Sequence, residues 1–225
     1  MVSKTQKIIF LYPPKTASNS LRVSLNNNGF IEDTQNDTYL TPKLHLKLDE
    51  IMVAYDIESL DGYKVIQVTR NPYDRMISGY YHQIRIFNRP DFESSASISG
   101  YTFDQFLLHL NSTKNSENFI DDFYCDSSHH INYVIENKKS WGGIRFYYTQ
   151  SSWKNVDCDF YHFKLEDLSK DIKPLSDLIN LPLSPLYQIN PNPIKVNYET
   201  HKTPQNKLII QNLFSEDFDT FGYEK

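Results

Sequence analysis

A short stretch near the start of the chain gathers side chains of the kind that bind anions. Lys15 supplies a full positive charge, and small hydroxyl or amide residues follow it, namely Thr16, Ser18, Asn19 and Ser20. An apolar run, Lys7–Tyr12, precedes this stretch, and helical spacing follows it. The N–H groups at the start of a helix point outward and carry partial positive charge, which favours an anion there. The stretch therefore predicts an anion-binding loop between a strand and a helix.

The loop is not a Walker A phosphate loop. That motif requires Gly-x-x-x-x-Gly-Lys-Ser/Thr, and the chain has no such run. Its absence argues against an ATPase or GTPase. Taken alone, the segment also fits an ordinary strand-to-helix turn in which Ser18 caps the helix.

A second motif begins where another strand is expected to end. Tyr63–Thr69 is rich in β-branched residues and predicts a strand, after which Asn71-Pro72 begins a helix with asparagine as cap and proline in the first position. Arg70 lies between these elements and offers a planar fork to phosphate oxygens. Ser78, eight positions further on, can approach the same group from the helix. A surface ion pair and a solvated serine are the alternatives for these two residues.

Both motifs resemble those of sulfotransferases that use 3'-phosphoadenylyl sulfate (PAPS). Pro-Lys-Thr-Ala-Ser-Asn-Ser-Leu resembles the family's 5'-phosphosulfate loop, usually written Pro-Lys-Thr/Ser-Gly-Thr-Thr, and Arg-Asn-Pro-Tyr-Asp-Arg-Met-Ile-Ser-Gly-Tyr-Tyr resembles its 3'-phosphate motif. The resemblance implies that Arg70 and Ser78 hold the 3'-phosphate. It also implies a set of residues for the 5' end: Pro14, Lys15, Thr16, Ala17, Ser18, Asn19 and Ser20. Ala17 departs from the pattern, because glycine is usual there.

The resemblance extends along most of the chain. Phe160–Leu168 looks like the family's late strand followed by an acidic helix start, and Phe214–Tyr223 resembles the ending of its carbohydrate-type and bacterial members. It implies an α/β fold of the P-loop NTPase-like sulfotransferase kind, a three-layer sandwich with a mostly parallel central sheet flanked by helices. We expect one domain over residues 1–225.

The pattern of the remaining elements predicts the same fold class. Helices are expected over Leu46–Tyr55, Glu166–Asn180 and Pro204–Phe214, the last of them capped by Thr203, and Thr102–Gln105 has the form of a capping box. Strands are expected over Ile144–Thr149 and Asp159–Phe163. Alternating strands and helices predict a largely parallel sheet, whose ligands bind at the carboxyl ends of the strands.

The implied reaction moves a sulfuryl group from PAPS to an acceptor hydroxyl or amine and releases 3',5'-ADP (PAP). We expect Lys15 to stabilise the leaving group and His45 to act as the base, because the family commonly places a catalytic histidine or glutamate near this point in the chain. Glu32 is a more distant alternative. Secondary candidates are His129 and His130 near the acceptor, and His201 and Lys202 near the 3'-phosphate. The donor is already activated, so no metal is expected.

Composition and charge exclude several other classes. The net charge of −5 and pI of about 5.8 disfavour a general nucleic-acid binder. No apolar run approaches the roughly 20 residues that span a bilayer, and no secretory signal pattern precedes the first strand. Cys125 and Cys158 fit free thiols in a reducing compartment, so we expect a cytoplasmic protein.

Two other functions stay open at this point. A small-molecule kinase of P-loop-like fold needs a Mg-binding acid at a strand end, where this chain has Arg70. A nucleotide-binding module that lacks catalysis needs neither Lys15 nor a base. The acceptor stays open among a glycan, a lipid, a metabolite and a protein, because acceptor pockets are built from variable loops.

Overall fold

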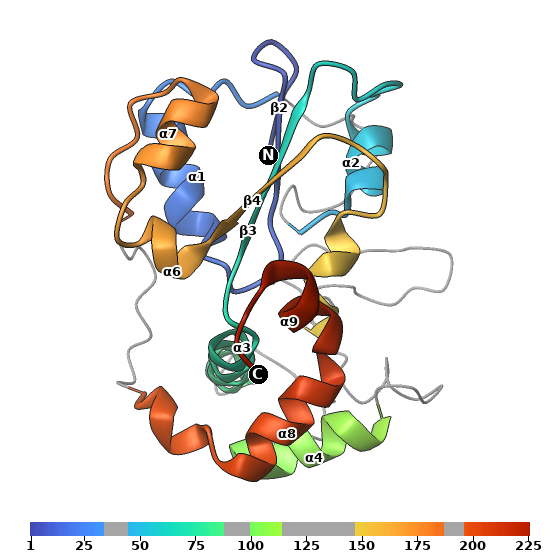
Figure 1. Cartoon of the computed structure of the whole chain (residues 1–225), viewed down its shortest axis with the longest axis vertical. Helices are drawn as coiled ribbons and strands as arrows, with labels where there is room; N and C mark the ends of the chain where they lie inside the picture. The colour runs from blue at the N-terminus through green and yellow to red at the C-terminus, as the bar shows by residue number, and fades with distance from the viewer. Residues whose placement is uncertain (34–44, 88–99, 114–146, 187–195) are drawn as a thin grey trace. The chain divides into compact units, whose positions relative to one another are not determined.

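A computed structural model describes residues 1–33, 45–87, 100–113, 147–186 and 196–225 (Figure 1). The chain divides into two compact units, each described by itself below. Unit 1 comprises Met1–Asn71 and Gln150–Pro191, and unit 2 comprises Pro72–Thr149 and Asn192–Lys225. The expectation of one domain over the whole chain stays a prediction.

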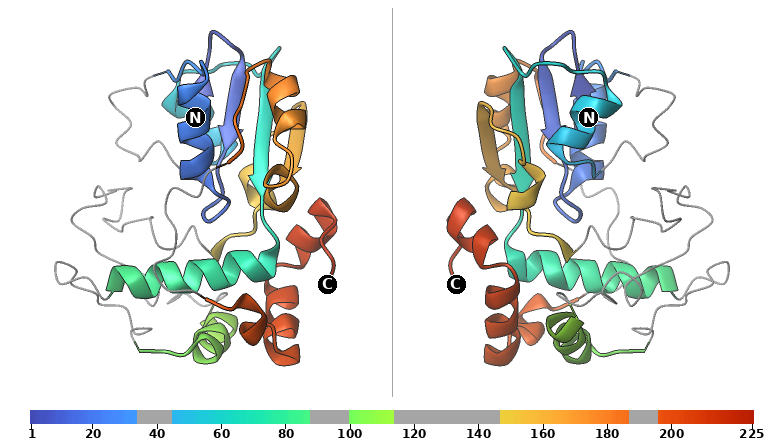
Figure 2. Two further views of the ribbon diagram at one scale, coloured as in Figure 1. Left: turned by 90° about the vertical axis from the view of Figure 1, so that its left-hand side faces the viewer. Right: turned by 90° about the vertical axis from the view of Figure 1, so that its right-hand side faces the viewer.

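Unit 1 is built on a four-stranded sheet in the order β1-β2-β3-β4. The strands are β1 (Val2–Ser3), β2 (Ile8–Leu11), β3 (Lys64–Thr69) and β4 (Phe160–Lys164). β2, β3 and β4 run parallel, and only β1 is antiparallel to its neighbour. The carboxyl ends of the three parallel strands therefore meet at one edge of the sheet, as Figure 2 shows. The predicted, mostly parallel sheet is confirmed.

Helices cover both faces of this sheet (Figure 1). α1 (Ser18–Asn27), α6 (Leu165–Leu168) and α7 (Lys173–Ile179) lie on one face, and α2 (Leu48–Ala54) lies on the other. Side chains alternate along a strand, so Ile8 and Phe10 face the first group of helices and pack with Leu21 of α1 and Leu175 of α7. This burial on both faces explains why β2 is a continuous apolar run. The predicted α/β class is confirmed.

Two predicted elements are wrong in their described parts. The helix expected over Glu166–Asn180 is broken into α6 and α7. Pro174 has no N–H to donate back into a continuing helix, but it suits the first turn of a new one, where the structure places it. The strand expected over Ile144–Thr149 is absent at Tyr147–Thr149, where the chain is bent and irregular and the Tyr147 ring is buried in the core of unit 2.

Unit 2 is helical in the part that the structure describes. Its elements are α3 (Pro72–Phe87), α4 (Phe103–Thr113), the short 3-10 helix η3 (Tyr198–His201), α8 (Pro204–Leu213) and α9 (Ser215–Phe221). Aromatic rings form much of the core, with Tyr80 of α3 against Phe103 and Phe106 of α4 at 5.3 Å between ring centroids. The Thr102–Gln105 capping box and the Thr203 cap are both present, as predicted.

No described helix is both long and apolar enough to cross a membrane. Cys158 is a free thiol in unit 1, and Cys125 lies outside the described residues. β2 ends at the predicted anion loop, β3 ends at Arg70, and β4 ends directly before α6. The fold thus brings the predicted loop and the predicted arginine to the same edge of the sheet.

Candidate functional site

The loop after β2 is held in an unusual backbone conformation. Lys15 and Ala17 have positive φ angles of 71° and 61°, in the left-handed region that residues with a side chain seldom adopt. Thr16 lies between them and is fully buried, and its hydroxyl donates a 2.7 Å hydrogen bond to the Pro13 carbonyl. When left-handed residues alternate with residues of ordinary conformation, successive N–H groups can point toward one side and form a concave site for an anion.

Helix α1 begins directly after this turn, and its cap is Ala17 rather than Ser18. An alanine side chain has no acceptor atom, so it cannot satisfy the first N–H groups of the helix. Those groups carry the partial positive charge of the helix end, which a bound anion can use. The left-handed Ala17 also explains why the resembled motif has glycine at this position, because glycine adopts that conformation without steric cost.

The predicted side-chain donors of the loop differ in what they can offer an anion. Thr16 has committed its hydroxyl proton to Pro13, so only its backbone N–H is left for another acceptor. Ser18 is buried, Asn19 is exposed, and Lys15 and Ser20 are half-buried. Of the predicted side-chain donors, the Thr16 hydroxyl is therefore already engaged within the loop.

Arg70 lies beside this loop within unit 1. Its guanidinium Nη1 donates to the Lys15 carbonyl at 3.3 Å. This contact brings the arginine expected to bind a second phosphate against the loop expected to bind the first. The two predicted halves of the binding site are thus neighbours in the structure, although Lys15 and Arg70 are 55 positions apart in the chain.

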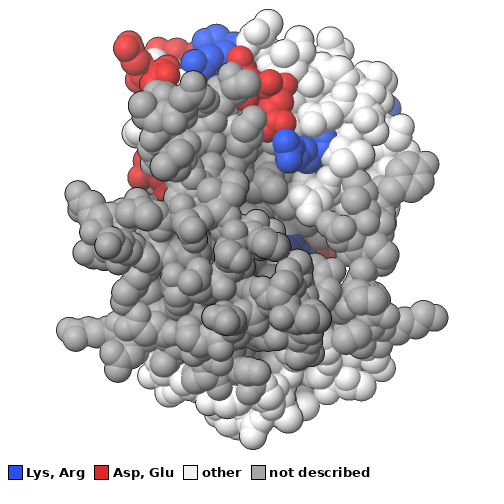
Figure 3. Space-filling view, turned by 180° about the vertical axis from the view of Figure 1, so that it is seen from behind, with Lys and Arg blue, Asp and Glu red and all other residues white. Residues whose placement is uncertain are grey.

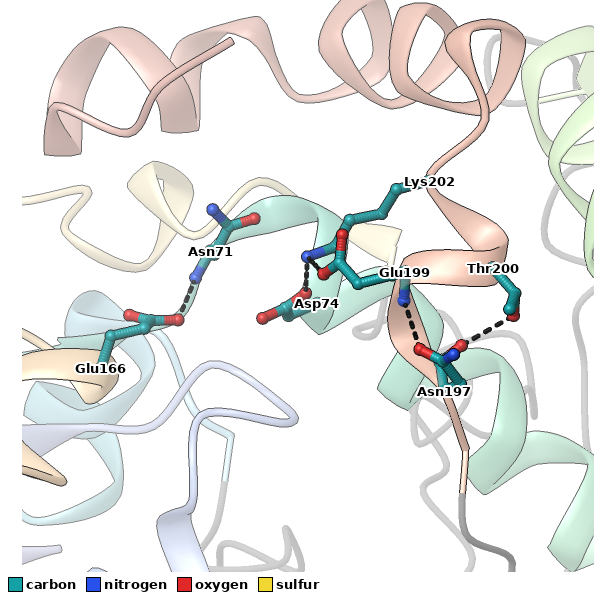
Figure 4. Close-up of polar contacts among 7 residues, drawn as sticks. All are labelled: Asn71, Asp74, Glu166, Asn197, Glu199, Thr200 and Lys202. Carbon is teal, nitrogen blue, oxygen red and sulfur yellow. Dashed lines mark hydrogen bonds and ion pairs between the residues drawn. The ribbon is translucent and has the colours of Figure 1, made fainter.

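The backbone at the end of β3 is held by side chains from distant parts of the chain. Gln150 accepts a hydrogen bond from the Arg70 N–H and donates one to the Arg70 carbonyl, both at 2.9 Å. Glu166 Oε1 accepts from the Asn71 N–H at 2.8 Å, and its carboxylate points directly at that nitrogen (Figure 4). Sequence reasoning gave neither residue a role, because these partners are 80 and 95 positions away from β3's end.

His45 contacts the backbone at the opposite end of the loop. Its Nδ1 lies 2.6 Å from the carbonyl oxygen of Tyr12, the residue after β2. A carbonyl can only accept, so Nδ1 must carry a proton, and in a neutral ring Nε2 then has the lone pair. His45 also has a positive φ of 73° and is half-buried. The tautomer fixed by Tyr12 is the one in which Nε2 can accept a proton.

A second histidine of unit 1 lies beside the end of β3. His162 Nε2 lies 2.7 Å from the Thr69 hydroxyl, one residue before Arg70. Burial, helped by the positive charge of Lys164, lowers the pKa of His162 to about 4. The ring is therefore neutral at pH 7, and it stabilises the strand end without adding charge to the site.

Glu32, the alternative base, lies in unit 1 and pairs with Arg22 at 3.4 Å. The other described candidates belong to unit 2, where His201 and Lys202 have contacts of their own. Ser78 is half-buried on α3. Lys202 forms ion pairs with Asp74 at 2.9 Å and with Glu199 at 2.7 Å (Figure 4), and His201 Nε2 lies 2.8 Å from the Tyr81 hydroxyl. A 3'-phosphate role for Ser78, His201 or Lys202 stays a prediction. His129 and His130 lie outside the described residues.

Charges outside the loop are mixed in sign. Figure 3 shows one face of the molecule, on which described Lys and Arg side chains lie directly beside Asp and Glu side chains. Within the described ranges, no group of three or more His, Cys, Asp or Glu is placed to hold a metal ion. The expectation that the reaction needs no metal stays a prediction.

A family profile and two solved structures resemble the chain. The profile of the family described as "Sulfotransferase family" matches residues 1–224. Among solved structures, a mouse sulfotransferase (SULT7A1) complexed with PAP is 15% identical over 97% of this chain and 91% of that one, with a TM-score of 0.47. A sulfotransferase from Alicyclobacillus acidocaldarius is 12% identical over 100% and 98% of the two chains, also with a TM-score of 0.47. No curated protein matches the chain.

Proposed function

The chain belongs to the sulfotransferase family, and from this premise we propose that it transfers a sulfuryl group from PAPS to a hydroxyl or amine of an acceptor and releases 3',5'-ADP. The observation that carries the proposal is the contact between Arg70 Nη1 and the Lys15 carbonyl. The contact supports the proposal because an arginine, the side chain best suited to a phosphate, lies against the loop predicted to bind an anion. PAPS has a phosphosulfate on the 5' side of its ribose and a phosphate on the 3' side. A protein that binds it therefore needs a site for each of these two anionic groups.

In the proposed complex, the loop after β2 binds the 5'-phosphosulfate. The N–H groups of the turn and of the first turn of α1 surround the phosphate oxygens, with Pro14 to Ser20 as the contact segment. Lys15 lies on the half-buried turn and neutralises charge on the bridging oxygen as it develops. Arg70 binds the 3'-phosphate, and the resemblance of the sequence motif assigns Ser78 to the same phosphate.

His45 is the proposed base. Its Nδ1 proton is directed at the Tyr12 carbonyl, which leaves Nε2 as the proton acceptor. The acceptor oxygen or nitrogen attacks sulfur in line, and the bond from sulfur to the bridging oxygen breaks. That electron pair stays on the 5'-phosphate of 3',5'-ADP, while the acceptor's proton moves to Nε2. The donor is already activated, so the proposed step includes no metal.

Transfer of labelled sulfate tests the proposal. Purified protein is incubated with PAPS carrying radioactive sulfur and a panel of a phenol, a tyrosine peptide, an oligosaccharide and a hydroxylated lipid, with and without EDTA. We expect a labelled product with at least one acceptor, unchanged by EDTA and absent from a Lys15→Ala preparation. Phosphate transfer from ATP that EDTA abolishes would favour the kinase instead. Binding of 3',5'-ADP without transfer to any acceptor would favour a module that lacks catalysis.

A further inference from the structure

At the end of β3, each of three successive residues is bonded by a different side chain. Thr69 is bonded through its hydroxyl to His162, Arg70 through both backbone groups to Gln150, and Asn71 through its N–H to Glu166, as described above. The register of β3 with β4 runs as far as Thr69 and Lys164. At the next residue, Arg70, the side-chain amide of Gln150 bonds both backbone groups, since it offers one donor and one acceptor, as a peptide group does.

Gln150 is itself fixed before it reaches Arg70. Gln150 is fully buried, and its backbone carbonyl accepts a 2.7 Å hydrogen bond from Nε2 of Gln67 on β3. Gln67 is fully buried as well, and its Oε1 accepts no hydrogen bond from the described residues. The Gln150 amide has both of its polar atoms bonded, so another orientation would leave a polar group without a partner. The backbone of Arg70 is therefore held by a buried amide with few alternative orientations.

We propose that Gln150 is a positioning residue for the 3'-phosphate site, with Glu166 as a second support one residue further along. It does not touch the ligand. It fixes the backbone of Arg70, so that the guanidinium starts from one place and reaches both the Lys15 carbonyl and the 3'-phosphate. An arginine held in this way loses less conformational freedom on binding than one on a mobile loop. The inference rests on the proposed function, because it assumes that Arg70 binds that phosphate.

The test compares two nucleotides that differ only in the 3'-phosphate. Dissociation constants for 3',5'-ADP and 5'-AMP are measured by calorimetry for the wild type and for Gln150→Glu. Glutamate still accepts from the Arg70 N–H, but its carboxylate cannot donate to the Arg70 carbonyl and repels it. We expect the preference for 3',5'-ADP to fall by about tenfold, the scale of a hydrogen bond to a charged group, while the affinity for 5'-AMP stays unchanged.

Gln6→Glu is the matched control. Gln6 also holds backbone with both ends of its amide, accepting from the Ile31 N–H at 3.0 Å and donating to the Gly29 carbonyl at 3.1 Å. The chemical change is therefore the same in kind, and the preference for 3',5'-ADP should not move. If Gln150→Glu does not fold, Glu166→Leu takes its place, because it removes the acceptor of the Asn71 N–H and should lower the same preference.

The possible outcomes distinguish failure of the positioning role of Gln150 from failure of the proposed function. Equal losses of 3',5'-ADP and 5'-AMP affinity in Gln150→Glu would mean that Gln150 is merely structural, and an unchanged preference would overturn the inference directly. A wild type without any preference for 3',5'-ADP would overturn the proposed function together with the inference. In an Arg70→Gln background the Gln150 substitution should have no further effect on the preference, since its effect acts through Arg70.

Discussion

The loop after β2 and the chain at the end of β3 lie at the same edge of one sheet, but they are held in different ways. The loop has a short-range bond of its own, from Thr16 to Pro13, besides the contacts that Arg70 and His45 make with its backbone, and it keeps two residues in left-handed conformations. The end of β3 is held by side chains that come from 80 and 95 positions away. The loop therefore carries backbone strain at two positions, whereas the backbone at the end of β3 depends on side chains that the complete fold brings to it.

This difference suggests that the two regions have different roles in the proposed reaction. A loop whose N–H groups are turned toward one side can surround a phosphosulfate closely, and strain of this kind is typical of functional sites. An arginine needs only a fixed starting point, which the Gln150 amide gives it. Substitutions in the loop should therefore change catalysis directly, and substitutions at the end of β3 should change affinity for one end of the nucleotide.

The largest effect is expected from the loop lysine. Lys15→Ala removes the charge that stabilises the leaving group, and kcat should fall by about 10³, near the upper end for loss of one stabilising group. Rates of labelled sulfate transfer from PAPS measure it. Lys170→Ala is the control, because Lys170 is an exposed surface residue in an ion pair with Asp167 and should leave kcat unchanged. A similar loss in both variants would contradict the assigned role.

His45 should come next, with a loss of about 10² in kcat, in the range for general-base catalysis. His45→Asn and His45→Ala are compared by the same transfer assay. An asparagine amide can still donate to the Tyr12 carbonyl but cannot take up the acceptor's proton. Both variants should therefore be equally slow. If His45→Asn retained the wild-type rate, the histidine would only support the loop, and Glu32 would become the better candidate for the base.

Arg70→Lys tests the end of β3 by itself. Lysine keeps the charge but loses the planar fork, so the affinity for 3',5'-ADP should fall by about tenfold. The affinity for 5'-AMP should stay the same, and kcat at saturating PAPS should change little. Titration calorimetry with both nucleotides measures this, with Arg22→Lys as a control, since Arg22 pairs with Glu32 instead. A loss of kcat with unchanged affinity for 3',5'-ADP would mean that Arg70 acts in catalysis and not in binding the 3'-phosphate.

The parts of the fold and of the candidate site that could be predicted from the sequence are those that depend on residues close together in the chain. The strands Lys7–Tyr12 and Tyr63–Thr69 and the start of α3 at Pro72 were predicted nearly in place, because apolar runs and helix caps are local signals. The anion loop and Arg70 were found through local motifs. Gln150 and Glu166 could not be assigned a role in this way, since a glutamine before a short 3-10 helix, η2 (Ser151–Trp153), carries no signal of the backbone that it will hold.

Acid should weaken the end of β3 through His162. Its pKa is about 4 in the folded chain against an ordinary 6.5, so the unfolded state binds the proton more readily between these values. Stability is complete above pH 6.5 and falls as the pH drops toward 4. The slope is at most about 1.4 kcal/mol per pH unit, and less for a partly exposed ring.

Denaturant unfolding at pH 7 and pH 5 measures this loss. His162→Gln, which can still bond to the Thr69 hydroxyl, should show a flatter dependence on pH over the same interval. An equal loss of stability in the wild type and in His162→Gln would assign the acid sensitivity to other groups.

The smallest effect concerns strain in the loop. Ala17→Gly should raise the free energy of unfolding by about 1 kcal/mol, because glycine adopts the left-handed conformation without the clash of a Cβ atom. Ala54→Gly at the end of α2 is the matched control and should lower it by about 1 kcal/mol or more, since that alanine is helical and buried. Thermal or urea unfolding gives both values, and a loss of stability in Ala17→Gly would contradict the conformation described.

Titration of the wild-type protein with 3',5'-ADP and with 5'-AMP tests the central claim most directly, because it needs no knowledge of the acceptor. In the proposed complex, one sheet edge carries a loop for the 5' end of the donor and an arginine for its 3' end. We expect 3',5'-ADP to bind at least about tenfold more tightly than 5'-AMP, since only the former engages Arg70. Equal affinity for the two nucleotides would contradict this arrangement.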